Sequence, residues 1–232
     1  MSNPTPDSPA TMQPRFYRDF KYKRRLLPNS YVADLERGVN SLEEAGAKTG
    51  LTIGFPGWNL LYYCCYCGLK PDGFNAIVET GTNQGFSTIF LAQALIDRGR
   101  QGHVYTVELD PENAAKARAN FTAAGVADRI TLFEGDSLVR LSEIVGNLES
   151  IRFAFLDGNH EREHVMKEFE IVLPKLEDKA TVFFDNTDYI GQPADDLRVF
   201  GALMDIQKKH GGNIVRFPFT SWYTPGQAIW QG

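Results

Sequence analysis

The sequence is poor in cysteine, and the few cysteines that it has are not dispersed along the chain. All three, Cys64, Cys65 and Cys67, lie in one short segment, so they cannot form the spaced pairs of a disulfide framework. A structural zinc site normally needs four ligands, which makes Cys64-x-x-Cys67 a weak metal motif. We therefore expect these cysteines to be packing residues in a reducing compartment.

Long apolar segments and a surplus of basic charge are also missing. No stretch is long and apolar enough to cross a membrane, and the N-terminus lacks a signal-peptide core, so we expect a cytoplasmic protein without a membrane partner. The 24 Lys and Arg residues against 29 Asp and Glu residues give a net charge of −5, which argues against a nucleic-acid partner. The basic and aromatic segment Arg15 to Arg25 is expected to be a solvated arm or a subunit contact that would allow a homo-oligomer.

The apolar pattern predicts one domain with an N-terminal cap. Residues 1–14 carry four prolines and are expected to be a disordered tail, and residues 15–72 are expected to form a helical cap on the substrate side. In that cap, Asn29 or Ser30 would start one helix whose apolar face runs from Leu35 to Ala45, and a buried helix would cover Trp58–Leu69.

From residue 73 to residue 232, short apolar strands alternate with longer amphipathic helices. This alternation predicts an α/β, Rossmann-like, doubly wound sheet of seven mostly parallel strands. The last two strands have no helix between them, so we expect an antiparallel C-terminal edge strand. The predicted strands cover 76–78, 103–107, 130–133, 153–156, 181–184, 213–217 and 228–230, and the predicted helices cover 87–97, 111–124, 137–145, about 161–173 and about 195–210.

A glycine turn joins the first strand of this sheet to its helix. Gly81 permits a sharp turn, Gly85 permits a close approach of a ligand, and Ser87 or Thr88 could cap the helix. The free N–H groups and the positive helix end would then face the crevice. The spacing fits neither the dinucleotide motif nor the phosphate loop, so it predicts another ligand, unless the turn serves packing alone.

Acids and amides follow five consecutive strands, where ligands bind in an open parallel sheet. Because both ribose hydroxyls can donate hydrogen bonds, Glu108 after the second strand is suited to bind them, which predicts a nucleoside-containing cofactor. Asp157, Asp185 and Asn186 supply three hard oxygen ligands that suit Mg²⁺, although the same residue types also cap turns and helices.

Five motifs in order resemble those of the class I S-adenosylmethionine-dependent methyltransferases, closest to the metal-dependent, catechol O-methyltransferase-like small-molecule enzymes. The motifs are Glu79-Thr-Gly-Thr-Asn-Gln-Gly-Phe-Ser87, Val-Glu108-Leu-Asp-Pro, Gly135-Asp-Ser137, Phe-Leu-Asp157-Gly-Asn-His160 and Phe-Phe-Asp185-Asn186. The resemblance covers roughly residues 58 to 187. It implies an O-methyltransferase that acts on a hydroxyl of a small molecule.

The resemblance also implies a role for each motif. The first would hold the methionine part of the cofactor, the second the ribose and the third the adenine, whereas the last two would bind a divalent metal. The implied cofactor-binding residues are Glu79, Gly81, Thr82, Gly85, Ser87, Glu108, Asp136, Ser137 and Asp157, and the implied metal ligands are Asp157, Asp185 and Asn186. His160 stands where the metal-dependent members commonly have a lysine base, and a neutral histidine can accept a proton near pH 7.

Other functions fit the sequence less well. His160-Glu-Arg-Glu-His164 matches the inverted zinc-peptidase pattern, but that site needs a further acidic ligand, and we expect His164 to lie on a helix surface. A nucleic-acid base methyltransferase is disfavoured because Asp185-Asn-Thr-Asp188 differs from the Asn-Pro-Pro-Tyr type, and a binding protein without catalysis would lack the metal triad. A metal-independent methyltransferase with the same cofactor pocket remains an alternative.

The sequence does not identify the methyl acceptor. We expect the acceptor site to be formed by the N-terminal cap and by two loops, 189–196 and 219–226. Aromatic residues of these segments could line it or could be ordinary core, namely Phe55, Trp58, Tyr62, Tyr189, Trp222 and Tyr223.

Overall fold

The computed structural model describes residues 27–37, 42–50, 53–54, 56–187, 198–218 and 226–232. These residues form one seven-stranded sheet in the order β3-β2-β1-β4-β5-β7-β6. The strands are β1 (Asn75–Thr80), β2 (Gly102–Glu108), β3 (Ile130–Glu134), β4 (Ile151–Leu156), β5 (Leu176–Asp185), β6 (Asn213–Phe217) and β7 (Gln227–Gln231). The predicted Rossmann-like α/β fold is therefore confirmed.

Strand direction in this sheet follows from the connections. β1 to β5 pair in parallel, since a helix returns the chain after each of the first four strands. β7 pairs antiparallel with both β5 and β6, as expected for strands without an intervening helix. The antiparallel strand is thus inserted between β5 and β6, and β6 occupies the edge.

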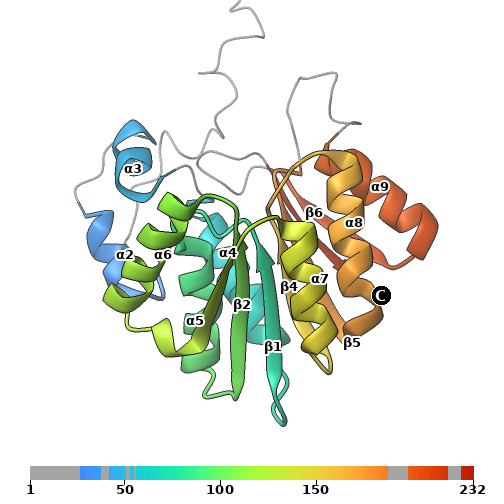
Figure 1. The fold of residues 1–232 in the computed structure, drawn as a ribbon, viewed down its shortest axis with the longest axis horizontal. Coiled ribbons are helices and arrows are strands. Elements are labelled where there is room, and N and C mark those ends of the chain that lie inside the picture. Colours follow the sequence, from blue (N-terminus) through green and yellow to red (C-terminus); the bar gives the residue numbers. More distant parts are fainter. Residues whose placement is uncertain (1–26, 38–41, 51–52, 55, 188–197, 219–225) are drawn as a thin grey trace, which may run out of the picture.

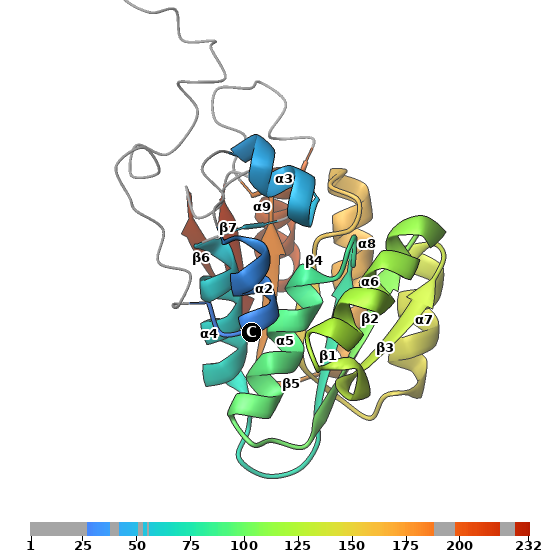
Figure 2. The same cartoon turned by 90° about the vertical axis from the view of Figure 1, so that its left-hand side faces the viewer.

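Two apolar cores cover the two faces of the sheet because successive strand residues point to opposite sides. Ile77, Phe155 and Phe183 belong to the core on the side of α4 (Gly57–Gly68), α5 (Phe86–Asp97) and α6 (Pro111–Ala123). Their neighbours Val78 and Phe184 belong to the core on the side of α7 (Ser137–Asn147), α8 (Arg162–Val172) and α9 (Val199–His210). Figures 1 and 2 show these helix layers on either side of the strands.

The N-terminal helices differ in part from the prediction. Asn29 caps α2 (Ser30–Leu35), as its side chain accepts hydrogen bonds from the backbone of Tyr31 and Val32. The single helix expected up to Ala45 is wrong, because α2 ends at Leu35 and α3 (Leu42–Thr49) is a separate helix. Within the described part of the chain, no helix is both long and apolar enough to cross a membrane.

The predictions for the cysteines and for the aromatic residues are partly confirmed. Cys65 and Trp58 are fully buried in the core, but Cys67 is exposed, so only part of the cysteine cluster packs. Burial raises the pKa of the Cys64 thiol to about 11, which keeps that thiol protonated. Outside the described residues lie the tail 1–14, the segment 15–25, the loop 189–196, nearly all of the loop 219–226, and Phe55, Tyr189, Trp222 and Tyr223.

Gly85, and neither Ser87 nor Thr88, is the N-cap of α5. Its φ of 87° is in the left-handed region, and a Cβ there would lie 2.4 Å from a ring carbon of Phe121 on α6. Gly85 therefore permits the close packing of α5 against α6. The predicted cap residues have another function, since both hydroxyls donate hydrogen bonds to the Glu79 carboxylate.

Glu79, near the end of β1, has a carboxylate with no exposed surface. It accepts hydrogen bonds from Ser87 at 2.6 Å, from Thr106 at 2.6 Å and from Thr88. Burial raises the pKa of Glu79 to about 7, and the three hydroxyl donors oppose this rise by stabilising the charged form. Glu79 therefore binds a proton more tightly in the folded protein than in the unfolded chain.

We expect the stability of the protein to fall between pH 5 and pH 8 because of Glu79. The folded protein holds this proton up to about pH 7, whereas the unfolded chain releases it near the ordinary value of 4.5. The free energy of unfolding therefore decreases as pH rises through this interval, by up to about 3 kcal/mol. Urea unfolding of the wild type and of Glu79→Gln, whose side chain does not titrate, measures this contribution as the difference between the two pH profiles.

The matched control is Glu143→Gln, which neutralises an exposed carboxylate. This variant should follow the wild-type profile. Parallel profiles for the wild type and Glu79→Gln would show that Glu79 binds no extra proton in the folded state.

Candidate functional site

A cleft of about 600 Å³ lies at the carboxyl ends of the parallel strands. Its walls come from the loops after β1, β2, β3, β4 and β5, because these ends meet at one edge of the sheet. A larger hollow of about 720 Å³ lies over α8 and α9, and of these loops only the one after β4 reaches it, through Glu161. The cleft is lined by Ile53, Gly81, Asn83, Val107, Glu108, Leu109, Asn113, Gly135, Asp136, Ser137, Asp157, Gly158, Asn159, His160, His164, Asp185 and Asn186.

The structure brings most of the predicted site residues together in this cleft. Those that line it are Gly81, Glu108, Asp136, Ser137, Asp157, His160, Asp185 and Asn186. Four others, Glu79, Thr82, Gly85 and Ser87, are not among its lining residues. Thr82, like Ser87, belongs to the hydroxyl cluster around Glu79, since its hydroxyl lies 2.5 Å from that of Thr106. These residues support the glycine loop from behind.

Glu108 ends β2 with its carboxylate held by two backbone amides. One oxygen accepts a hydrogen bond from the N–H of Asp110 at 2.9 Å, and the other accepts one from the N–H of Asn83. Asn83 lies in the turn after Gly81 and has a left-handed φ of 50°. A carboxylate has about four acceptor positions, so two remain for the two hydroxyls of a ribose.

The loops after β1 and β4 approach each other closely at Gly81. A Cβ at this position would lie 2.0 Å from the carbonyl oxygen of Asp157, and the φ of Gly81 is 80°. Only glycine permits both features. The Gly81 loop and the Asp157 loop therefore share one wall of the cleft.

Asp157 and His160 form a pair within the β4–α8 loop. Nε2 of His160 lies 3.1 Å from Oδ1 of Asp157, and the two side chains are 26% and 18% exposed. Burial raises the pKa of the Asp157 carboxyl, while the hydrogen bond to His160 opposes this rise. The carboxylate thus lacks full compensation from the described residues, which would favour a cation beside it.

Asp185 and Asn186 occupy the end of β5. Oδ1 of Asn186 is buried and has no hydrogen-bond partner among the described residues, and Asn186 has a left-handed φ of 56°. An acceptor oxygen in this state fits a metal ligand, since a cation would satisfy it. In the described part of the chain no three His, Cys, Asp or Glu side chains group as metal ligands, so a site here would depend on the amide oxygen of Asn186.

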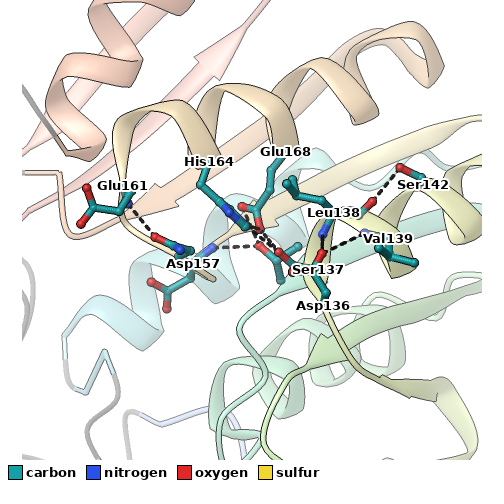
Figure 3. A network of polar contacts seen from close by, with 11 residues as sticks. Asp136, Ser137, Leu138, Val139, Ser142, Asp157, Glu161, His164 and Glu168 are labelled. Carbon is teal, nitrogen blue, oxygen red and sulfur yellow. Dashed lines mark hydrogen bonds and ion pairs between the residues drawn. The ribbon is translucent and has the colours of Figure 1, made fainter.

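The prediction for His164 is wrong, because this residue lines the cleft. Its Nε2 lies 2.8 Å from the Ser137 hydroxyl and 3.3 Å from a carboxylate oxygen of Glu168, which has no exposed side-chain surface (Figure 3). Thr80 of β1 donates to the other oxygen of Glu168 at 3.1 Å. His160 and His164 thus face different partners, and they do not form the pair that a zinc hydrolase needs.

Glu168 and Thr80 are not among the site residues predicted from the sequence. Glu168 is one of several acids on a helix in which acids alternate with apolar residues, so the local pattern predicts exposure. The signal that could have identified it is its spacing from His164, because residues four apart lie on the same face of a helix.

Comparison with known proteins agrees with this geometry. A family model described as a methyltransferase domain matches residues 78–187. A catechol O-methyltransferase from Mycobacterium tuberculosis is 32% identical over 161 residues, which cover 67% of this chain and 68% of that protein. A catechol O-methyltransferase from Niastella koreensis is 34% identical over 107 residues, which cover 46% of this chain and 45% of that protein.

Solved structures share the fold. The O-methyltransferase from Bacillus cereus, solved in complex with S-adenosylhomocysteine, superposes with a TM-score of 0.64 at 22% identity and covers 87% of this chain and 95% of its own. The O-methyltransferase TomG from Streptomyces achromogenes, solved with S-adenosylmethionine, gives a TM-score of 0.63 at 20% identity, with coverage of 94% and 95%. With its fold, its strand-end motifs and its relatives in agreement, the chain belongs to the class I S-adenosylmethionine-dependent O-methyltransferases.

Proposed function

We propose that this enzyme transfers the methyl group of S-adenosylmethionine to a hydroxyl of a small molecule, and that a divalent cation, Mg²⁺ by preference, assists the transfer. The observation that carries the proposal is that Glu108, Asp157 and Asn186 line one cleft. The first suits a ribose, and the other two are hard oxygen ligands. The cofactor supplies an activated methyl group, and the protein aligns the acceptor oxygen with it.

The cofactor end of the cleft extends from Gly81 to Ser137. In this proposal the backbone around Gly81 holds the methionine part, Glu108 accepts both ribose hydroxyls, and the turn Asp136–Ser137 holds the adenine. Glu79, Thr82, Gly85 and Ser87 contribute to cofactor binding by fixing the shape of the glycine loop, since their side chains contact one another or α6.

The acceptor end contains Asp157, Asp185 and Asn186, which would hold the cation. A divalent cation lowers the pKa of a coordinated hydroxyl and so makes it a better nucleophile. His160 is proposed as the general base. Since its Nε2 faces Asp157, its other ring nitrogen is available to accept a proton from the substrate.

Several further assignments belong to this proposal. The segment 15–72 would be the acceptor-side cap of the core 73–232, and the arm Arg15 to Arg25 would provide a subunit contact. The protein would act in the cytoplasm on a small molecule, without a nucleic-acid partner. A metal-independent enzyme with the same cofactor pocket is the second candidate, because no three His, Cys, Asp or Glu side chains group as metal ligands among the described residues.

We expect Glu108→Ala to weaken the binding of S-adenosylhomocysteine by about 2–3 kcal/mol, which is the scale of losing hydrogen bonds to a charged group. Titration calorimetry measures this loss directly. Glu112→Ala, at an exposed position on α6, is the control and should bind like the wild type. Equal affinities in Glu108→Ala and the wild type would contradict the ribose assignment.

We expect Asp185→Ala and Asn186→Ala to reduce turnover by at least about 100-fold while leaving the affinity for S-adenosylhomocysteine within about twofold, since several kcal/mol of charge stabilisation would be lost at the acceptor alone. A chelator should have the same effect, reversed by added Mg²⁺. Asp128→Ala, at an exposed position, serves as control. Full turnover in excess chelator would favour the metal-independent alternative.

We expect His160→Gln to reduce the single-turnover rate by about 10²- to 10⁴-fold, the usual contribution of a positioned base. The glutamine amide can still donate to Asp157, so the variant removes basicity with little change in the pair. A variant that retains the wild-type rate would show that the hydroxyl is activated without His160.

A further inference from the structure

A polar network connects the start of α7 to α8 and β1 behind the cleft. Ser137 donates a hydrogen bond of 2.6 Å to Oε1 of Glu168, and Nε2 of His164 lies 2.8 Å from the same hydroxyl. The second oxygen of Glu168 accepts from Thr80, whose hydroxyl also accepts from the N–H of Asp157 at 3.3 Å. Figure 3 shows Ser137, His164 and Glu168 converging between α7 and α8.

The hydrogen bonds of Ser137 determine which ring nitrogen of His164 carries a hydrogen. The Ser137 hydroxyl has one hydrogen, which it donates to Glu168, so it can only accept from His164. Nε2 of His164 must therefore carry a hydrogen, which points at both Ser137 and Glu168. Because Nε2 contacts both partners, this group does not have the geometry of a hydrolytic Ser-His-Glu triad, in which the acid holds Nδ1.

We propose that His164 and Glu168 are positioning residues for the cofactor, which hold the Ser137 hydroxyl at the nucleoside end of the cleft and thereby set the affinity for S-adenosylmethionine. This inference rests on the proposed function, which assigns the turn Asp136–Ser137 to the adenine. Two observations support it independently of that function: Glu168 is fully buried, and His164 lines the cleft. A buried carboxylate is costly unless it is paired, so a positive charge on His164 would stabilise Glu168.

The surroundings of His164 favour its charged form. The hydrogen bond to Glu168 raises the pKa of His164, and desolvation opposes this rise. Asp136 at the start of α7 also raises it, and Lys167 on α8 lowers it. Asp157 and His160 of the β4–α8 loop line the same cleft, and Thr80 of β1 adds no charge.

Deprotonation of charged His164 removes the single arrangement of the network, because only the charged ring is certain to carry a hydrogen on Nε2. A neutral histidine can carry its hydrogen on Nδ1 instead, and Nε2 then competes with Glu168 for the Ser137 hydrogen. Glu168 also loses its counter-charge. The affinity for the cofactor should therefore fall as pH rises through the pKa of His164.

Binding of S-adenosylhomocysteine between pH 6 and pH 9 tests this inference. We expect the Kd of the wild type to increase about tenfold over this range, the scale of one or two hydrogen bonds. His164→Leu should bind about tenfold more weakly at pH 6 and should show a flat profile. His164→Gln, which restores a donor but no charge, should regain only part of the affinity and should also show a flat profile.

His210→Gln is the matched control. Nε2 of His210 also lies 3.3 Å from a glutamate oxygen, that of Glu170, but His210 is at the end of α9 and does not line the cleft. This variant should bind with the wild-type affinity and the wild-type pH dependence.

A measurement on the unmodified protein is independent of how the variants fold. If protonation of His164 favours binding, then bound S-adenosylhomocysteine must raise the proton affinity of His164 by the same factor, and hence raise its pKa. An NMR titration of the histidine ring protons with and without the ligand measures this change. An unchanged His164 pKa, or equal affinities of the wild type and His164→Leu at every pH, overturns the inference alone, whereas a wild type that does not bind S-adenosylhomocysteine overturns the proposed function as well.

Discussion

The contact on which the site depends is the close approach of Gly81 to the backbone of Asp157. A side chain at Gly81 would lie 2.0 Å from the Asp157 carbonyl oxygen, so the two loops can meet only through glycine. β1 and β4 are neighbours in the sheet, and their ends are thereby joined into one wall. For this reason a residue suited to a ribose and residues suited to a cation open into the same cleft.

Two buried carboxylates stiffen that wall from behind. Glu79 is surrounded by the hydroxyls of Ser87, Thr88 and Thr106, and Glu168 by those of Ser137 and Thr80. A satisfied polar network in a low dielectric is rigid, since each lost hydrogen bond leaves a costly unpaired group. The binding loops are thus fixed before a ligand arrives, which reduces the entropy cost of alignment.

Much of the fold could be predicted because it follows from local periodicity. The helices of the core begin and end close to their expected positions, since caps such as Asp110 and Asp136 mark their starts. β5 begins at Leu176 although the apolar pattern starts only at Thr181, because Lys179 with its φ of 61° interrupts the alternation. The prediction of one helix up to Ala45 is wrong because the helical spacing of apolar residues continues beyond Leu35, where α2 ends.

By itself the sequence determined the sheet and the residues at its carboxyl edge, including Glu108, Asp157 and Asp185, because parallel strands bring their ends together whatever the details of packing. Only the tertiary structure decided how the remaining polar residues are used. The Ser87 hydroxyl donates a hydrogen bond to Glu79 instead of capping a helix. The Ser137 hydroxyl donates one to Glu168, which is 31 residues away in the sequence. Such contacts depend on how α7 packs against α8, and the periodicity within either helix carries no information about that packing.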